Sequence, residues 1–260
     1  MNFNVPFIPE RTSKPREAGI TMMMDKGLGT KEAESFAEAA GPYTDLVKFG
    51  FGTALITKNL EEKIKLYRSA GMDPYFGGTL FEMFKVRNRI DDYKKFIDKY
   101  GIETVEVSDG SMKIELEDKL EMISDLSKNM RVLSEVGSKV KGVELSNNDW
   151  VMHMKRELEA GAWKVIAEAR ESGTIGIYNS DGSANKSLIE DIMKEISVDD
   201  VLWEAPIKNQ QVMFIQLIGH NVNLGNIAPA EVVALEALRI GMRGDTFFQF
   251  LPDEYQDKRL

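Results

Sequence analysis

Short apolar runs alternate with amphipathic segments along the chain, from about residue 19 onward. Strands of a parallel barrel are covered on both sides, so they read as nearly continuous apolar runs. Eight such runs occur, at residues 20–25, 45–49, 74–78, 104–108, 131–136, 163–168, 201–205 and 222–225. Amphipathic segments lie between them and after the last one. The pattern therefore predicts eight β/α units, which is an α/β fold of the (β/α)8 TIM barrel type.

The amphipathic segments carry signals that start and stop helices. Thr30 precedes the first segment, and Gly71, Gly101, Gly161 and Gly241 follow four of the others. The predicted helices are residues 31–40, 60–70, 90–100, 116–129, 149–160, 186–196, 209–218 and 229–240. The charged segment 115–128 is interpreted as a solvated outer face. A doubly wound open sheet would also alternate strands and helices, but it usually has fewer units, so a repeat count of eight favours closure.

No linker rich in proline, glycine or serine separates the units, so the sequence predicts one barrel domain over residues 1–260. Residues 1–18 are expected to form an extended N-terminal segment of that domain. No run of about 18 apolar residues is present, and charges and prolines fill the N-terminal segment. We therefore expect neither a membrane span nor a signal peptide. Cysteine is absent, which is compatible with the cytoplasmic location that we expect.

Charged residues interrupt the predicted strands near their C-terminal ends. Lys48, for example, alternates with Val47 and Phe49, which suit the outer face that packs against helices. The same period of two directs six charged side chains toward the barrel axis: Asp25, Lys48, Glu106, Glu135, Glu168 and Glu204. Barrel enzymes hold their chemistry at this end. Structural ion pairs inside the mouth are the alternative, but six charges on one rim favour a functional site.

Composition limits what these charges do. The chain has no cysteine, two histidines and a net charge of -9, which excludes thiolate chemistry and does not suit nucleic acid or an anionic membrane. Glutamates without histidine or cysteine favour hard oxygen ligation, so Mg2+ is the expected cofactor. Glu135 and Glu204 are the leading candidate ligands, with Glu106 and Glu168 behind them.

Small residues follow several predicted strands. The strings are Gly50-Phe51-Gly52-Thr53, Gly77-Gly78-Thr79, Asp109-Gly110-Ser111, Glu171-Ser172-Gly173-Thr174 and Leu224-Gly225-Asn226. Backbone N–H groups approach an anion closely where no side chain intervenes, and helix N-termini add a favourable dipole. A single loop of this kind is more simply a tight turn. Their recurrence beside Arg170 and the lysines favours a phosphorylated or multiply anionic ligand.

Longer strings from the same regions resemble one known family, phosphosulfolactate synthase. They are residues 45–53, 77–82, 133–139, 168–173, 204–206, 210–211, 222–227 and 243–247. The resemblance covers nearly the whole chain in the same order. It implies a (β/α)8 barrel that adds sulfite to phosphoenolpyruvate with Mg2+. The product in archaeal members is (2R)-phospho-3-sulfolactate, on the route to coenzyme M, and plant heat-stress-associated proteins are among the relatives.

The resemblance also implies roles for individual residues. Lys139 matches the lysine proposed as the family's general acid, which protonates C2 of the substrate. Lys48 is the second expected catalytic residue, and with Arg170 it is expected to bind phosphate, carboxylate or sulfite. The other expected substrate-binding residues are Lys26, Gly78, Thr79, Ser172, Gly173 and Asn226. Phosphoenolpyruvate and sulfite are the expected partners, and we expect a homo-oligomer.

Two alternatives stay open at this point. One is a metal-independent Schiff-base aldolase, in which Lys48 or Lys139 attacks a carbonyl. Borohydride trapping of an adduct, with full activity in chelator, would favour it. The other is a non-catalytic stress-related or interaction protein built on an inherited barrel. Failure of the folded protein to bind phosphoenolpyruvate would support it.

Overall fold

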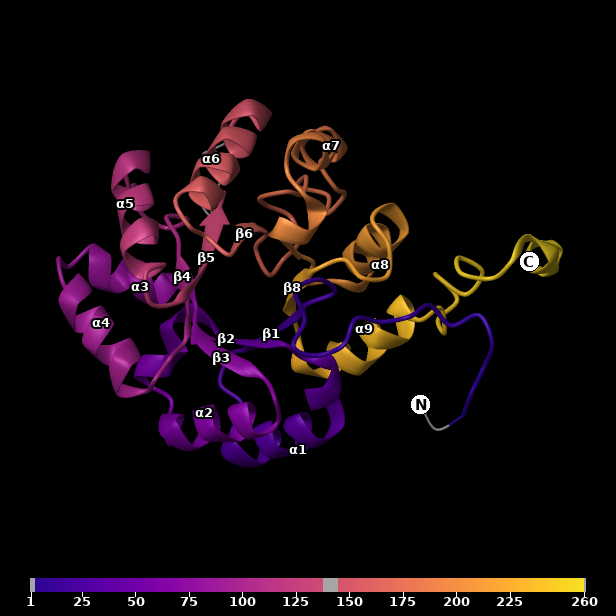
Figure 1. The fold of residues 1–260 in the computed structure, drawn as a ribbon, viewed down its shortest axis with the longest axis horizontal. Coiled ribbons are helices and arrows are strands. Elements are labelled where there is room, and N and C mark those ends of the chain that lie inside the picture. Colours follow the sequence, from indigo (N-terminus) through magenta and orange to yellow (C-terminus); the bar gives the residue numbers. More distant parts are fainter. Residues whose placement is uncertain (1–2, 138–144, 260) are drawn as a thin grey trace.

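Eight parallel strands close into a barrel in the order of the sequence (Figure 1). The structure, a computed structural model, describes residues 3–137 and 145–259. The strands are β1 (Thr21–Asp25), β2 (Leu46–Phe49), β3 (Asp73–Phe76), β4 (Thr104–Val107), β5 (Arg131–Val136), β6 (Lys164–Ala167), β7 (Val201–Glu204) and β8 (Leu224–Ile227). Strand β8 pairs with β1, which closes the sheet. The predicted (β/α)8 fold is confirmed.

Helices form the outer ring around the strands (Figure 1). The α-helices are α1 (Thr30–Ala40), α2 (Leu60–Ser69), α3 (Gly78–Lys85), α4 (Ile90–Lys99), α5 (Leu116–Leu126), α6 (Asn147–Glu159), α7 (Lys186–Glu195), α8 (Lys208–Leu217) and α9 (Val232–Arg239). The 3-10 helices are η1 (Gly41–Tyr43), η2 (Gly50–Leu55), η3 (Val198–Asp200), η4 (Pro229–Glu231) and η5 (Asp253–Lys258). No helix in the described ranges is long and apolar enough to cross a membrane.

The structure differs from the expected pattern at three places. Helix α3 begins at Gly78, where the small-residue string predicted only a loop. Strand β8 begins two residues later than expected, and just before it the Asn223 side chain bonds the backbone of Ile20 and Val201. The solvated face expected over 115–128 is wrong for Lys119, which is 1% exposed and bonded to groups inside the protein.

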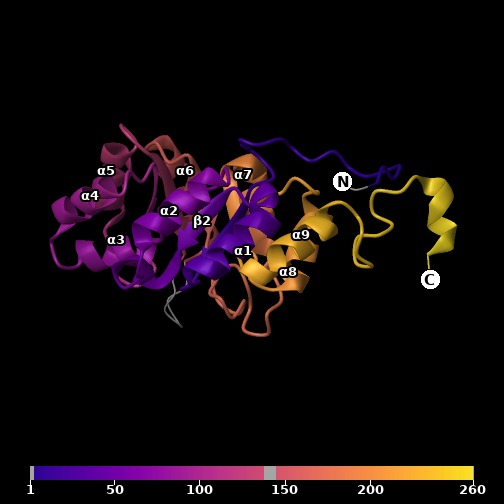
Figure 2. The same cartoon turned by 90° about the horizontal axis from the view of Figure 1, so that it is seen from below.

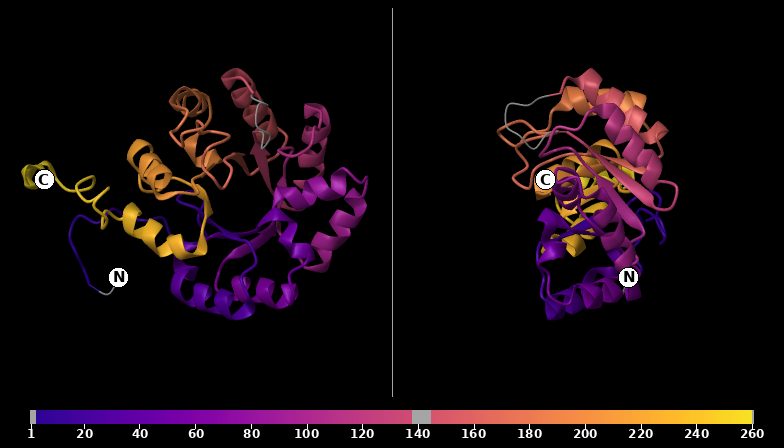
Figure 3. Two further views of the ribbon diagram at one scale, coloured as in Figure 1. Left: turned by 180° about the vertical axis from the view of Figure 1, so that it is seen from behind. Right: turned by 90° about the vertical axis from the view of Figure 1, so that its left-hand side faces the viewer.

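The chain termini lie away from the β6–α7 loop. The N-terminal segment runs across one end of the barrel, and the long loop between β6 and α7 projects from the other (Figure 2). The Lys14 ammonium ties that segment down, donating to the carbonyl oxygens of Gly41 and Gly71 at 2.8 Å each. The first residues and those after α9 extend together from the helix ring (Figures 1 and 3), and the rings of Phe7 and Tyr255 lie 5.5 Å apart there.

Asp25 does not point into the barrel, and the prediction that it faces the axis is wrong. Its carboxylate lies between β1 and α2, where it accepts a hydrogen bond from the Tyr67 hydroxyl at 2.8 Å and pairs with the Lys63 ammonium at 2.6 Å. Backbone N–H groups of Gly27 and Leu28 donate to its other oxygen. One carboxylate oxygen of Asp25 is thus used by α2 and the other by the loop after β1, so Asp25 is a structural residue.

Replacing Asp25 with Asn is expected to lower the free energy of unfolding by about 3–5 kcal/mol, because the Lys63 ammonium then stays buried without its counter-charge. Urea denaturation measures the change. Glu61→Gln is the matched control, since it breaks an exposed ion pair with Lys65 and should change stability little. Equal denaturation midpoints for Asp25→Asn and the unchanged protein would contradict the structural role.

Candidate active site

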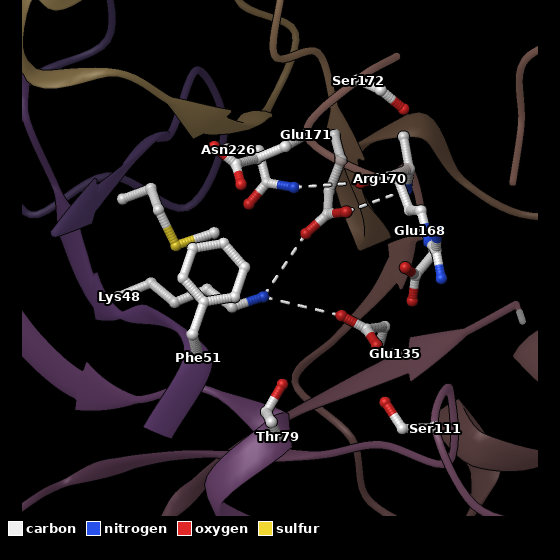
Figure 4. Close-up of a pocket in the computed structure, with 13 residues that line it drawn as sticks. Lys48, Phe51, Thr79, Ser111, Glu135, Glu168, Arg170, Glu171, Ser172 and Asn226 are labelled. Atoms are coloured by element: carbon white, nitrogen blue, oxygen red, sulfur yellow. Dashed lines mark hydrogen bonds and ion pairs between the residues drawn. The ribbon is translucent and has the colours of Figure 1, made fainter. Parts of the chain in front are cut away.

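A cavity of about 460 Å³ opens at the C-terminal ends of the strands (Figure 4). Its walls come from strand ends and from the loops that follow them. The described residues that line it are Met24, Lys48, Phe51, Thr79, Ser111, Glu135, Glu168, Ala169, Arg170, Glu171, Ser172, Glu204 and Asn226. This end of a barrel is where enzymes of this fold carry out their chemistry, so the cavity is the candidate active site.

Three buried carboxylates converge on one side of the cavity. Glu135 lies in β5, Glu168 directly follows β6, and Glu204 ends β7. Each offers an oxygen, and these oxygens all lie within 4.8 Å of one another. Neighbouring strands are about 4.8 Å apart, so three adjacent strand ends bring the groups together although they are distant in sequence. An all-oxygen group of this kind fits a hard divalent cation.

Glu106 does not join this group. Its carboxylate accepts hydrogen bonds from the Gly78 backbone N–H at 2.6 Å and the Tyr75 hydroxyl at 3.0 Å. Its remaining close contact is the Lys48 ammonium at 3.0 Å. The structure therefore brings Glu168 together with Glu135 and Glu204, whereas Glu106 is held by β3 and by the start of α3.

Lys48 places its ammonium among the carboxylates. Its Nζ atom lies 3.0 Å from Glu106 and 3.4 Å from Glu204. It lies 3.5 Å from Glu135, a pair that Figure 4 marks with a dashed line. Burial alone lowers the pKa of Lys48, but the charges of Glu106, Glu204 and Glu135 outweigh it and raise the pKa well above its ordinary value. Lys48 is therefore held as an ammonium. A Schiff base needs a neutral amine, so this environment disfavours Lys48 as the nucleophile of an aldolase.

Hydrogen bonds around β7 and β8 orient the Glu204 carboxylate. The backbone N–H of Ala169 donates to Glu204 at 2.8 Å, and the Asn226 side chain donates to the carbonyl oxygen of Ala169 at 3.1 Å. Asn226 adopts a φ of 57°, a left-handed conformation that asparagine tolerates better than most residues. Asn226 thus both lines the cavity and fixes the backbone next to Arg170.

The loop after β6 supplies the second wall. Arg170, Glu171 and Ser172 line the cavity from this loop, and Gln210 holds it by donating to the carbonyl oxygen of Gly173 at 3.0 Å. Glu171 forms an ion pair with Lys26, which follows β1, so the pair spans two loops of the mouth. The side chains of this pair are half exposed. Arg170 is the cation that this wall presents to the cavity.

The predicted substrate-binding residues divide into two groups. Arg170, Thr79, Ser172 and Asn226 line the cavity, as does Lys48. The others lie next to it: Lys26 pairs with Glu171, Gly78 packs on Glu106 and Ser108, and Gly173 packs on Gln210. A Cβ atom on Gly78 would lie 2.2 Å from the Ser108 hydroxyl, so glycine is required there by packing. Lys139, the predicted general acid, lies outside the described residues.

Five of the lining residues are not among the site residues predicted from the sequence: Met24, Phe51, Ser111, Ala169 and Glu171. Phe51 places its ring beside Lys48 (Figure 4) and adopts a φ of 54°, which is unusual for a bulky residue. Ser111 lies across the cavity from Asn226, on the loop after β4. Phe51 and Ser111 both belong to the small-residue strings whose recurrence favours an anionic ligand. A glycine-flanked phenylalanine carries no signal that it faces a cavity, because its direction depends on the left-handed turn.

A closed (β/α)8 barrel with converging charged side chains at its C-terminal mouth defines the class of TIM-barrel enzymes. Within it, a model of the ComA family, described as (2R)-phospho-3-sulfolactate synthase, matches residues 9–245. The chain is 42% identical to the phosphosulfolactate synthase of Bacillus subtilis (strain 168), over 93% of this chain and 97% of that protein. It is also 42% identical to the phosphosulfolactate synthase of Methanothermobacter thermautotrophicus, over 92% of this chain and 95% of that protein. The chain therefore belongs to the phosphosulfolactate synthase family of enzymes, and the resemblance seen in the sequence is confirmed.

A solved structure gives a separate view of the fold. The 3-hexulose-6-phosphate synthase of Salmonella typhimurium matches with a TM-score of 0.52 and 13% sequence identity, over 85% of this chain and 98% of that chain. At this identity the likeness shows the barrel fold alone. The chemistry of the chain has to be argued from its own cavity.

Proposed function

We propose that this enzyme catalyses the Mg2+-dependent addition of sulfite to C3 of phosphoenolpyruvate, forming (2R)-phospho-3-sulfolactate. The family membership supports the reaction, since its curated relatives are phosphosulfolactate synthases. The observation that carries the metal part is the group of Glu135, Glu168 and Glu204, whose oxygens lie within 4.8 Å of one another beside Lys48 and Arg170. The three carboxylates could hold a cation, and Lys48 and Arg170 could bind anions.

The charge of the cavity favours a divalent ion. Among the described residues that line it, four are glutamates and two, Lys48 and Arg170, are cationic. A cavity with this excess of negative charge repels two anionic substrates unless a cation offsets it. Glu135, Glu168 and Glu204 would hold Mg2+, since all their donors are the hard oxygens that this ion prefers. The bound ion would stabilise the negative charge that develops on the substrate carboxylate.

The side chains of this enzyme would bind and orient the two anionic substrates and supply the proton to C2. The guanidinium of Arg170 offers paired donors to phosphate, carboxylate or sulfite, and the Lys48 ammonium offers a point charge between the carboxylates and the cavity. Sulfite sulfur forms a bond to C3, and the electrons of the C2–C3 double bond move to C2. A proton then joins C2. We assign that proton to Lys139, whose amine regains it from water.

Other parts of the proposal follow from the family alone. Where the organism makes coenzyme M, the product would enter that route. A homo-oligomer and a cytoplasmic location stay predictions. Of the two rival functions, the Schiff-base aldolase is disfavoured only with Lys48 as its nucleophile, because Lys48 is held as an ammonium. With Lys139 as nucleophile it is distinguished by borohydride trapping, and the non-catalytic protein is distinguished by the turnover test that follows.

Purified protein incubated with phosphoenolpyruvate, sulfite and Mg2+ is expected to form the sulfonated product, detected by mass spectrometry. Addition of EDTA should abolish product formation, and excess Mg2+ should restore it, because the carboxylate group alone repels the substrates. Reactions without sulfite serve as the control. Full activity in chelator would refute the metal requirement. Absence of product, with phosphoenolpyruvate still bound, would refute the proposed reaction.

Glu168→Gln is expected to weaken the binding of Mn2+, used as a probe for Mg2+, by about tenfold or more. Even residues that only support metal ligands contribute this much to affinity. Electron paramagnetic resonance measures the binding. The matched control is Glu171→Gln. Glu171 also lines the cavity, but it pairs with Lys26 and lies outside the three-carboxylate group. Equal losses in the two variants would show that Mn2+ responds only to the general charge of the mouth.

Lys139→Ala is expected to keep the fold and lower turnover by about 100- to 10,000-fold, the usual contribution of a general acid. Circular dichroism checks the fold, and the rate of product formation gives turnover. Lys113→Ala is the control, because Lys113 is exposed and pairs only locally with Glu115. Turnover near that of the unchanged protein in Lys139→Ala would exclude Lys139 as the acid.

A further inference from the structure

A buried lysine supports the acidic side of the cavity from outside the barrel. Lys119, in α5, is 1% exposed, and its ammonium has three acceptors. It donates to the backbone carbonyl oxygen of Glu135 at 2.7 Å and to the carboxylate of Asp109 at 2.9 Å, and it pairs with Glu157 of α6 at 2.8 Å. An ammonium has three N–H donors, so the geometry uses all of them.

The first of these acceptors belongs to a candidate metal ligand. Strand β4 pairs with β5 only as far as Ser134, so Glu135 lies beyond the last paired position on that side. The Lys119 ammonium supplies a donor to the Glu135 carbonyl where β4 no longer runs beside β5. The side chain of Glu135 extends the other way, into the cavity, where it lies 3.5 Å from Lys48 (Figure 4). Lys119 thus holds the backbone of Glu135, while the side chain of Glu135 faces the cavity.

The neighbouring residues are tied to the same cluster. The hydroxyl of Ser134 donates to Glu157 at 2.6 Å, so consecutive residues of β5 both contact the Lys119–Glu157 pair. Asp109 lies on the loop after β4, two residues before Ser111, which lines the cavity. The cluster therefore connects the end of β5, the loop after β4 and the helices α5 and α6.

The cost of burying these charges points to a purpose beyond stability. Burial lowers the pKa of Lys119, but the nearby charges of Glu157 and Asp109 outweigh it and raise the pKa above its ordinary value. Burial also raises the pKa of Glu157. Buried ion pairs often stabilise a protein no better than apolar side chains of the same size, whereas their directional bonds fix a backbone in one position. Here the fixed backbone is that of Glu135.

We propose that Lys119 is a positioning residue for Glu135: its ammonium fixes the end of β5 so that the Glu135 carboxylate stays within ligating distance of Glu168 and Glu204. The inference rests on the proposed function, because it concerns the same metal group. Lys119 touches neither substrate nor cation in this role. It acts through the backbone of Glu135 and should affect the affinity for the metal ion.

The test is Mn2+ binding to the double variant Lys119→Met and Glu157→Gln, which removes both buried charges together. Electron paramagnetic resonance titration is expected to show an affinity lower by about 10- to 100-fold, as for other residues that support metal ligands. The control is Lys63→Met with Asp25→Asn, an equally buried pair between α2 and β1 whose carboxylate does not line the cavity. Its Mn2+ affinity should match that of the unchanged protein.

The outcomes separate the two proposals. If the unchanged protein binds no Mn2+, the proposed metal site is wrong and the role of Lys119 falls with it. If the unchanged protein binds Mn2+ and the double variant binds it equally well, only the role of Lys119 is overturned. Equal losses in the Lys63 control would also overturn it, by showing a general effect of instability. If the double variant does not fold, Lys119→Met alone replaces it, because it removes the donor to the Glu135 carbonyl while Glu157 keeps its bond from Ser134. Unchanged affinity there overturns the proposal.

Discussion

The ammonium of Lys48 is the interaction on which the barrel mouth depends. It lies within 3.5 Å of carboxylates from three other strands, Glu106, Glu135 and Glu204. Buried carboxylates at such separations repel one another strongly unless a cation lies between them. Among the described residues that line the cavity, four glutamates face two cations, Lys48 and Arg170, which leaves an excess of negative charge on this part of the rim. That excess makes the site suited to a divalent ion and links the fold to its chemistry.

The same chemical groups serve a different purpose on the outer side of the strands. There, Asp25 pairs with Lys63, whose ammonium also donates to the carbonyl oxygen of Leu28. Lys119 pairs with Glu157, and its ammonium has three acceptors. These clusters are compact, and their charges nearly cancel. The cavity combines several carboxylates with few cations, and its groups face open volume. The balance of charge distinguishes structural ion pairs from the candidate catalytic group better than burial does, because both kinds are fully buried.

The count of eight alternating segments, with the family resemblance, was sufficient to predict the fold, and period-two alternation predicted most of the mouth. Lys48 and the glutamates at the ends of β5 and β7 stand between apolar or small neighbours, so their direction can be read from the sequence. Asp25 could not be placed in this way, since it follows three consecutive methionines that define no face. Lys119 could not be recognised as buried, because its partners Asp109 and Glu157 come from other elements. The string Gly77-Gly78-Thr79 predicted a loop after β3, whereas α3 begins at Gly78, whose close packing on Ser108 leaves no room for a side chain.

The arrangement of the carboxylates makes strand register a determinant of chemistry. Glu135, Glu168 and Glu204 come from neighbouring strand ends, and a shift of one residue in any of these strands would turn its carboxylate away from the cavity. Apolar packing alone tolerates small displacements of a strand end, because dispersion and hydrophobic forces have little directionality. Hydrogen bonds tolerate less displacement, because their strength depends on distance and angle. The bonds from Lys119 to the Glu135 carbonyl and from Ala169 to the Glu204 carboxylate therefore fix what the hydrophobic core leaves free, and the geometry of the active site depends on them as much as on the glutamates themselves.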